Sequence, residues 1–366
     1  MNWFEIKNIE SIDSPALIIY KDRVEKNIQS LIQMKDVEHL RPHVKTNKIA
    51  KVCKMMLEAG ITKFKCATIA EAEMLGMINA PDVLLAYQPT QTKAKRLLQL
   101  IQKYPATHFS CLIDDAENTE NISKIFSENN KKLDVYIDLN VGQNRTGIKT
   151  ENAFQLFEDC ENLQGINIIG LHAYDGHIRD INIDERKRNA DKAFSDVIQL
   201  AEKIESSAQK KLNIVAGGSP TFPVHAQRKN IECSPGTFVF WDWGYKTQFA
   251  DEPFQLAALV ITRIISIVDE HTICTDLGHK SVGAENTIDK RVYFLNAENV
   301  LPDGQSEEHL VLKVSDASQY KIGDVLYGVP YHICPTVALY ERAIIVDNNN
   351  VIDEWKVIAR DRKITV

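Results

Sequence analysis

The feature that most constrains this fold is a regular alternation of strand-like and helix-like segments between about residues 38 and 234. Strands are expected at 38–46, 63–68, 82–87, 108–113, 133–140, 166–174, 212–217 and 230–234. Amphipathic helices are expected at 48–58, 70–78, 91–103, 116–128, 151–160 and 184–209. About eight strands that alternate with helices predict an α/β protein with a parallel (β/α)8 barrel of the TIM type. A doubly wound open sheet would give a similar alternation and is the alternative fold.

A different pattern precedes and follows the alternation. A short apolar strand at 16–20 and a helix at 22–35 are expected to lead into the barrel and to close it. Beyond about Gly244 the apolar residues follow a period of two, and no helix longer than about two turns is indicated. We therefore predict a barrel domain at 14–245 and a second, all-β domain at 246–366, which residues 1–13 join.

Composition excludes several classes of function. Of the 366 residues, 44% are apolar and 25% are charged, as in ordinary soluble globular proteins. The formal net charge of -7, without a cluster of lysine and arginine, argues against nucleic acid as a partner. The seven cysteines are scattered and never form a CxxC pair, which favours a reducing compartment. No signal peptide or membrane-spanning run is recognisable, so we expect a soluble, cytoplasmic protein.

Lys45 is an unusual residue for its expected position at the end of the first strand. Desolvation at such a position disfavours the ammonium form, and a free lysine amine forms Schiff bases with carbonyl compounds. The alternative is a lysine whose amine simply reaches solvent beyond the end of the strand. Because enzymes built on barrels carry their chemistry at the carboxyl ends of the strands, the other strand ends decide between the two interpretations.

Those strand ends carry a coherent set of polar residues. Arg145 lies in a glycine-flanked loop after the fifth strand, and His172 and Tyr174 end the sixth on one face. Loops rich in glycine and hydroxyl groups follow the last two strands, at 217–221 and 234–237. Such loops offer backbone N–H groups and hydroxyl donors to a phosphate. Each piece alone is more typical of an ordinary turn, but together they predict an aldehyde cofactor that carries a phosphate.

The motifs at 41–46, 66–73, 144–147, 217–221 and 234–237 together resemble the pyridoxal phosphate enzymes of the alanine racemase fold (fold type III). Within that fold they are similar to the D-threonine aldolase and D-serine dehydratase family, over about residues 14–359. The resemblance implies that Lys45 is the Schiff-base lysine, that Arg145 contacts the phenolic oxygen of pyridoxal 5'-phosphate and that His172 lies against its ring. The phosphate-binding residues implied in the same way are Gly218, Ser219, Thr221, Gly236 and Thr237. The family usually has histidine where this chain has Asn47, a departure that leaves the cofactor lysine in place.

A second candidate site is His332 with Cys334, in the expected β domain. In an extended segment their side chains would project from one face, about 7 Å apart, and could converge on one metal ion. Two ligands are fewer than a zinc site needs, so a buried cysteine beside a loop histidine is the alternative. The family resemblance implies a divalent-metal pair here. A thiolate favours zinc over manganese or magnesium, and a cysteine at the second position leans toward the dehydratase branch.

These observations predict a metal-assisted, pyridoxal-phosphate-dependent lyase of D-3-hydroxy amino acids, which acts on a small-molecule substrate through an external aldimine. Lys45 would remove the α-proton for β-elimination, the metal would assist either elimination or retro-aldol cleavage, and Tyr174 would be the second acid or base. An amino-acid racemase and a non-catalytic pyridoxal phosphate carrier are the alternatives. By analogy with relatives of the fold, we expect a homodimer.

Overall fold

In the computed structural model, which describes residues 1–366, a parallel sheet is built from the region of alternating strands and helices. Its strands follow one another in the order β2-β3-β4-β5-β7-β8-β9, with the short β6 paired to β5. Their bounds are β2 Lys63–Cys66, β3 Asp82–Leu85, β4 His108–Ile113, β5 Leu133–Asn140, β6 Ile148–Lys149, β7 Ile166–Ala173, β8 Asn213–Ala216 and β9 Ile231–Cys233. The parallel order confirms the barrel class and excludes the doubly wound alternative, in which the strand order reverses.

The segment at 40–44 closes this sheet into a barrel. Arg41 N donates to Cys233 O on β9, and Val44 N donates to Lys65 O on β2, each at 2.9 Å. The expected strand at 38–46 is nevertheless wrong as a regular element, because only isolated bridges form at Leu40 and His43. Pro42 explains the interruption, since it has no N–H group to donate to a ladder.

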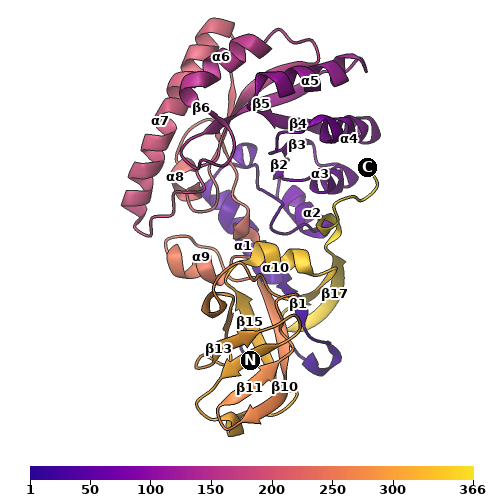
Figure 1. Ribbon diagram of the computed structural model, residues 1–366, viewed down its shortest axis with the longest axis vertical. Helices are drawn as coiled ribbons and strands as arrows, with labels where there is room; N and C mark the ends of the chain where they lie inside the picture. The colour runs from indigo at the N-terminus through magenta and orange to yellow at the C-terminus, as the bar shows by residue number, and fades with distance from the viewer. The chain divides into compact units, whose positions relative to one another are not determined.

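Helices cover the outside of the barrel, as Figure 1 shows for α3, α4 and α5, which lie side by side. The α-helices of the chain are α1 Lys21–Met34, α2 Ala50–Glu58, α3 Ile69–Met77, α4 Gln91–Lys103, α5 Ala116–Ser127, α6 Thr150–Cys160, α7 Ile183–Ala208, α8 Phe222–His225, α9 Trp243–Gln248 and α10 Ile333–Leu339. In α4 the buried residues Ala94, Leu97 and Leu98 recur at helical spacing, so one apolar face packs inward. None of the helices combines the length and the apolar character that crossing a membrane requires.

The barrel interior changes in character along the strands. An apolar layer contains Leu84, Leu112, Tyr136 and Val215, which come from four different strands. Toward the amino ends, the fully buried Arg41 joins carboxylates on two strands at 2.6 Å, Asp82 and Glu232. His108, which starts β4, lies 2.8 Å from Asp134. This charged ring fills the mouth of the barrel opposite to the one where the strands end.

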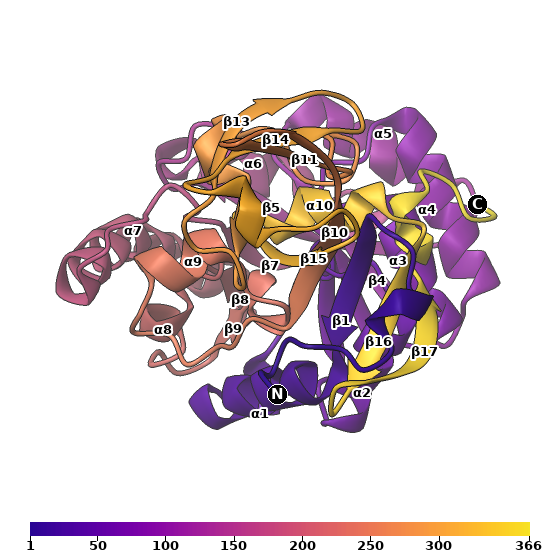
Figure 2. The ribbon, with the colours of Figure 1, turned by 90° about the horizontal axis from the view of Figure 1, so that it is seen from below.

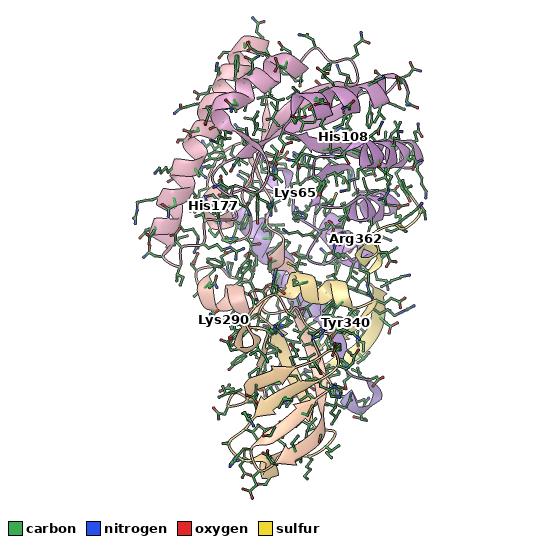
Figure 3. The ribbon with its side chains drawn as sticks, viewed as in Figure 1. Lys65, His108, His177, Lys290, Tyr340 and Arg362 are labelled. Atoms are coloured by element: carbon green, nitrogen blue, oxygen red, sulfur yellow. The ribbon has the colours of Figure 1, made fainter.

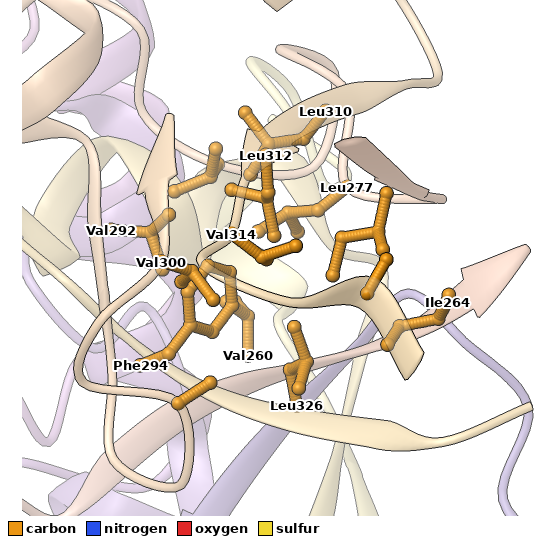
Figure 4. Packing of buried hydrophobic residues seen from close by; sticks show 14 residues of the cluster. Val260, Ile264, Leu277, Val292, Phe294, Val300, Leu310, Leu312, Val314 and Leu326 are labelled. Carbon is orange, nitrogen blue, oxygen red and sulfur yellow. The ribbon is translucent and has the colours of Figure 1, made fainter. Parts of the chain in front are cut away.

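The remaining strands form a second, mostly antiparallel sheet of nine strands. Its path is β13-β14-β11-β10-β1-β16-β17, and β15 pairs with both β10 and β12. The bounds are β1 Ala16–Tyr20, β10 Ala258–Asp269, β11 Thr272–Thr275, β12 Val292–Phe294, β13 Leu301–Gln305, β14 Leu310–Lys313, β15 Val325–Pro330, β16 Arg342–Asp347 and β17 Asn350–Lys356. Strand β13 was not expected, because it contains Pro302 and Gly304, two residue types that are uncommon inside strands. Leu312, Phe294, Val260 and their apolar neighbours form the core on this sheet (Figure 4).

The first strand of the chain is not part of the barrel. The expectation that 16–20 leads into the barrel is wrong, because β1 pairs antiparallel with β10 and parallel with β16. Figure 2 shows β1 beside β16 and β17. Two compact units result: a barrel unit at 31–45, 52–236 and 361–366, and a β unit at 1–30, 46–51 and 237–360. Residues 1–13 belong to the β unit, and the longest segment of the barrel unit ends at residue 236.

Candidate active site

Lys45 lies in a turn just after the segment that closes the barrel. Its backbone N–H donates to Nδ1 of His43 at 3.2 Å, and the preceding residue is hydrogen-bonded to β2. The side chain is half-buried, and its Nζ lies 5.9 Å from the centre of the Tyr174 ring. The first and the sixth expected strand ends thus meet, as the barrel interpretation requires.

The Tyr174 ring is surrounded by cations. The guanidinium of Arg145 lies 5.2 Å from the ring centre, and a second lysine, Lys65, places its Nζ at 5.5 Å. Distances of this size allow attraction between each cation and the aromatic face. We call Lys45, Lys65 and Arg145 the cation cluster. Lys45 and Arg145, with the buried amine of Lys65 beside them, create a place suited to an anionic ligand.

Lys65 is the functional candidate that the sequence analysis missed. It lies inside β2, is only 2% exposed, and Figure 3 shows it in the interior of the barrel unit. Burial and the nearby charge of Lys45 lower the pKa of Lys65 to about 7. The sequence Lys63-Phe64-Lys65-Cys66 contained a signal for this position. Side chains alternate between the two faces of a strand, so Phe64 and Cys66 face the helices, and Lys63 and Lys65 face the barrel interior.

His172 is held between Asp138 and Lys65. Its Nδ1 lies 2.7 Å from Asp138 Oδ1, on the neighbouring strand at the paired position, and its Nε2 lies 3.4 Å from Lys65 Nζ. Gln88 donates to the second oxygen of Asp138 at 2.7 Å. Burial and the charge of Lys65 lower the pKa of His172. Burial opposes ionisation of Asp138, but the hydrogen bond with His172 still holds the pKa of Asp138 below its usual value.

The two glycine-bearing loops are joined to each other. Gly236 N donates to Ser219 Oγ at 3.2 Å, so the loop after β9 contacts the loop after β8. Thr221 Oγ1 accepts from Gly218 N and directs its own proton to Asp175, 2.7 Å away, which makes it a brace of the first loop. All five of these residues are buried.

These loops and the cation cluster fit a phosphate-bearing cofactor. Ser234 Oγ, in the second loop, is buried and has no hydrogen-bond partner in the structure, which an anion would supply. A Cβ on Gly218 would approach the Tyr174 ring to 2.8 Å, so the backbone there passes close to the ring without a side chain. The residues present therefore fit pyridoxal phosphate, and Lys45 presents an amine of the kind that reacts with its aldehyde.

The second candidate site lies in the β unit and has a different geometry from the expected one. His332 and Cys334 do not share a strand face, because His332 is the N-cap of α10 and Cys334 lies in its first turn. Pro335 fits this first turn, where a missing N–H costs no helical hydrogen bond. Cys334 Sγ lies 3.1 Å from Thr46 Oγ1 and 3.9 Å from Thr237 Oγ1. Thr46 follows Lys45 directly in the chain.

Acidic residues surround His332. Glu285 Oε1 lies 2.5 Å from its Nδ1, and Asp242 Oδ2 accepts from Ile333 N at 3.2 Å. Burial opposes the charged form, but the hydrogen bond and the charge of Cys334, followed by the charge of Asp242 and the hydrogen bond with Glu285, raise the pKa of His332 to about 9. The structure shows no group of three or more potential metal ligands. Glu285 was not expected, since 47 residues separate it from His332.

Comparison with known proteins places the chain in a family. The "Alanine racemase, N-terminal domain" matches residues 19–242, more than half of the chain, and the "Putative serine dehydratase domain" matches residues 257–346. A D-threonine aldolase from Arthrobacter sp. is 24% identical over 95% of this chain and 93% of its own length. A D-threo-3-hydroxyaspartate dehydratase from Delftia sp. (strain HT23) is 22% identical over 94% and 97%.

A solved structure has the same fold. The D-threonine aldolase from Filomicrobium marinum superposes with a TM-score of 0.88, at 24% identity, over 98% of both chains. This likeness covers the barrel strands and the antiparallel sheet alike. The first of the two domain matches shows that this chain belongs to the alanine racemase N-terminal domain family, and the second match lies in the part of the chain after the barrel.

Proposed function

We propose that this protein is a pyridoxal-phosphate-dependent, metal-assisted lyase of D-3-hydroxy amino acids. The observation that carries the proposal is the meeting of Lys45, Arg145 and Tyr174 at the carboxyl ends of the barrel strands. Support comes from relatives that span more than nine-tenths of this chain and are named as an aldolase and a dehydratase of hydroxylated D-amino acids.

Residues of the barrel unit would hold the cofactor and move protons. When bound, pyridoxal phosphate supplies an aldehyde that an amine attacks and a ring that withdraws electrons from the substrate's α-carbon. Lys45 is the amine that would anchor it and then take the α-proton, and Arg145 would face its phenolic oxygen. Gly218, Ser219 and Gly236 would bind the phosphate, with Thr221 as their brace. Thr237, which the family resemblance also assigns to the phosphate, is the first residue of the next segment of the β unit. Tyr174 would be the second acid or base.

Residues of the β unit would hold the metal ion. His332 Nε2 and Cys334 Sγ are the proposed ligands, and Glu285 would orient the imidazole by accepting from Nδ1. A thiolate and an imidazole favour zinc, with manganese or magnesium as weaker candidates. A zinc ion there would be a Lewis acid for the substrate's β-hydroxyl.

The choice between aldol cleavage and dehydration is a matter for product analysis. Protein loaded with pyridoxal phosphate and zinc is incubated with D-threonine, and with L-threonine as the control. Glycine plus acetaldehyde identifies an aldolase, and 2-oxobutanoate plus ammonia identifies a dehydratase. We expect activity on the D-isomer that a chelator abolishes and zinc restores.

Variants make this test specific. Lys45→Ala should remove both the activity and the cofactor absorbance that borohydride traps on the protein, whereas Lys51→Ala, which alters a surface ion pair with Asp353, should change neither. The proposal is wrong if the loaded protein transforms no D-3-hydroxy amino acid. Deuterium exchange into both enantiomers of an amino acid without a hydroxyl would instead identify a racemase.

The proposal extends to assembly and compartment. A homodimer is proposed by analogy with other proteins of this fold, and light scattering on the purified protein tests it. None of the seven cysteines forms a disulfide, which supports a cytoplasmic location in a reducing compartment.

A further inference from the structure

Lys65 has a position that none of the proposed catalytic steps uses. The whole side chain is enclosed in the barrel, so the amine does not reach solvent as most lysines do. Its backbone is part of the closure, because Lys65 N donates to Pro42 O at 2.9 Å and its carbonyl accepts from Val44 N. The amine has one hydrogen-bonding neighbour, Nε2 of His172 at 3.4 Å. Any role of this buried amine must therefore be exerted through His172.

The two contacts of the imidazole define its protonation. Gln88 donates to one oxygen of Asp138, and the pKa of Asp138 is held below its usual value, so Asp138 is an ionised carboxylate that can only accept a hydrogen bond from His172. Nδ1 of His172 must then carry a proton. In an uncharged imidazole the other nitrogen, Nε2, is an acceptor, and Lys65 is the group placed to donate to it.

We propose that Lys65 is a positioning residue of the active site, which donates to Nε2 of His172 and, together with Asp138, clamps the imidazole uncharged in one tautomer and one orientation. The evidence for this clamp is the pair of contacts that His172 makes with Lys65 and Asp138. The purpose of the clamp rests on the proposed function and on the family resemblance, which implies that His172 lies against the cofactor ring. An imidazole held at both nitrogens presents its flat face to the cofactor ring. Because both nitrogens are engaged, the imidazole does not exchange protons with the substrate. Proton transfer is left to Lys45 and Tyr174.

The surrounding charges agree with this arrangement. Lys65 is influenced by the cations Lys45 and Arg41 and by the carboxylates Asp138 and Asp175. His172 is influenced by Lys65, Asp138 and Arg145. Burial among these groups lowers the pKa of Lys65 to about 7, so near neutral pH its amine donates without adding a full positive charge beneath the imidazole. The alternative is a lysine that merely fills space beside Leu84, its paired residue on β3.

The first experiment examines the cofactor-free protein by nitrogen NMR of labelled histidine. The His172 signals are assigned by their loss in His172→Gln. In the wild type we expect one uncharged form, with the proton on Nδ1, from about pH 6 to 8. In Lys65→Met the imidazole loses its donor and the partial positive charge beside it, so we expect a mixture of forms and protonation within this range. Lys63→Met is the matched control on the same strand, since Lys63 pairs with Glu232 instead.

The second experiment is a double-mutant cycle on the dissociation constant of pyridoxal phosphate, measured by its absorbance. Lys65→Met should weaken binding by about tenfold in the wild type, on the scale of one lost polar contact. In the His172→Gln background the same change should have almost no effect, because Lys65 acts through His172. An equal loss in both backgrounds, or unchanged His172 signals in Lys65→Met, overturns the clamp.

Two outcomes keep the inference separate from the proposed function. If the protein binds no pyridoxal phosphate, the proposed function fails, and the NMR experiment still decides whether Lys65 holds His172. If Lys65→Met does not fold, Asp138→Asn tests the clamp from its other side. That variant should lose the single tautomer, and retention of the wild-type His172 signals contradicts the proposal.

Discussion

Replacement of Glu285 by alanine should weaken zinc binding without unfolding the protein. Glu285 lies 2.5 Å from Nδ1 of His332, so it fixes the ring with Nε2 directed away from the carboxylate. Loss of such an outer carboxylate typically costs 10- to 100-fold in metal affinity. Both side chains are nearly half exposed, at 43% and 47%, and solvent screens their attraction. We therefore expect the lower end, about tenfold or about 1.4 kcal/mol.

The assay is competition for zinc against a chromogenic chelator at pH 7.5, with calorimetric melting curves as a check on folding. Glu285→Gln should lie between wild type and Glu285→Ala, because an amide oxygen still accepts a hydrogen bond but lacks the charge. Glu341→Ala removes an exposed carboxylate of the same unit and should leave zinc affinity unchanged. Zinc affinity in Glu285→Ala equal to that of the wild type would refute the reasoning. Failure of His332→Asn to reduce binding would refute the metal site itself.

Three further predictions concern the barrel. Hydrogen bonds with Asp134 and Asp82 raise the pKa of His108 to about 9, so its stabilising charge is fully present below about pH 6.5 and is lost as the pH rises through 9. His108→Gln should lower the melting temperature at pH 6 and hardly at pH 10, and an equal decrease at both would contradict this. Arg41→Met should cost about 3 kcal/mol in urea unfolding, because it leaves two carboxylates in the barrel mouth. A loss of unfolding free energy below about 1 kcal/mol would mean that the Asp82 and Glu232 carboxylates become hydrated in the variant. Gly218→Ala should displace the Tyr174 ring and weaken pyridoxal phosphate binding about tenfold, with an unchanged melting curve.

Much of the site was predictable because its residues lie at strand ends. The carboxyl ends of parallel strands meet at one mouth of a barrel, so Lys45, Arg145 and Tyr174 could be expected to gather once the alternation was recognised. The structure bears out this meeting of side chains from three distant segments. The roles assigned to these residues remain predictions for the experiments above.

Other features depend on contacts that a local pattern does not contain. The short strand at 16–20 was recognised as a strand, but its sheet was wrong, because its partners β10 and β16 lie more than 200 residues away. His332 and Cys334 were assigned to an extended segment, whereas a helix starts between them. Only two residues separate the end of β15 at Pro330 from the start of α10. So short a segment does not show whether its apolar residues follow the period of a strand or that of a helix.

The sequence by itself determined the alternation of elements and the chemistry available at the strand ends, since burial of one face leaves a period in the chain. Only the tertiary structure decided what each buried polar group faces. Lys65 is an unremarkable strand residue until the barrel closes and places its amine against His172, and Glu285 is one acid among many until folding brings it to His332. The physical reason is that periodicity records the direction of a side chain relative to its own element, whereas its partner is set by the packing of distant elements.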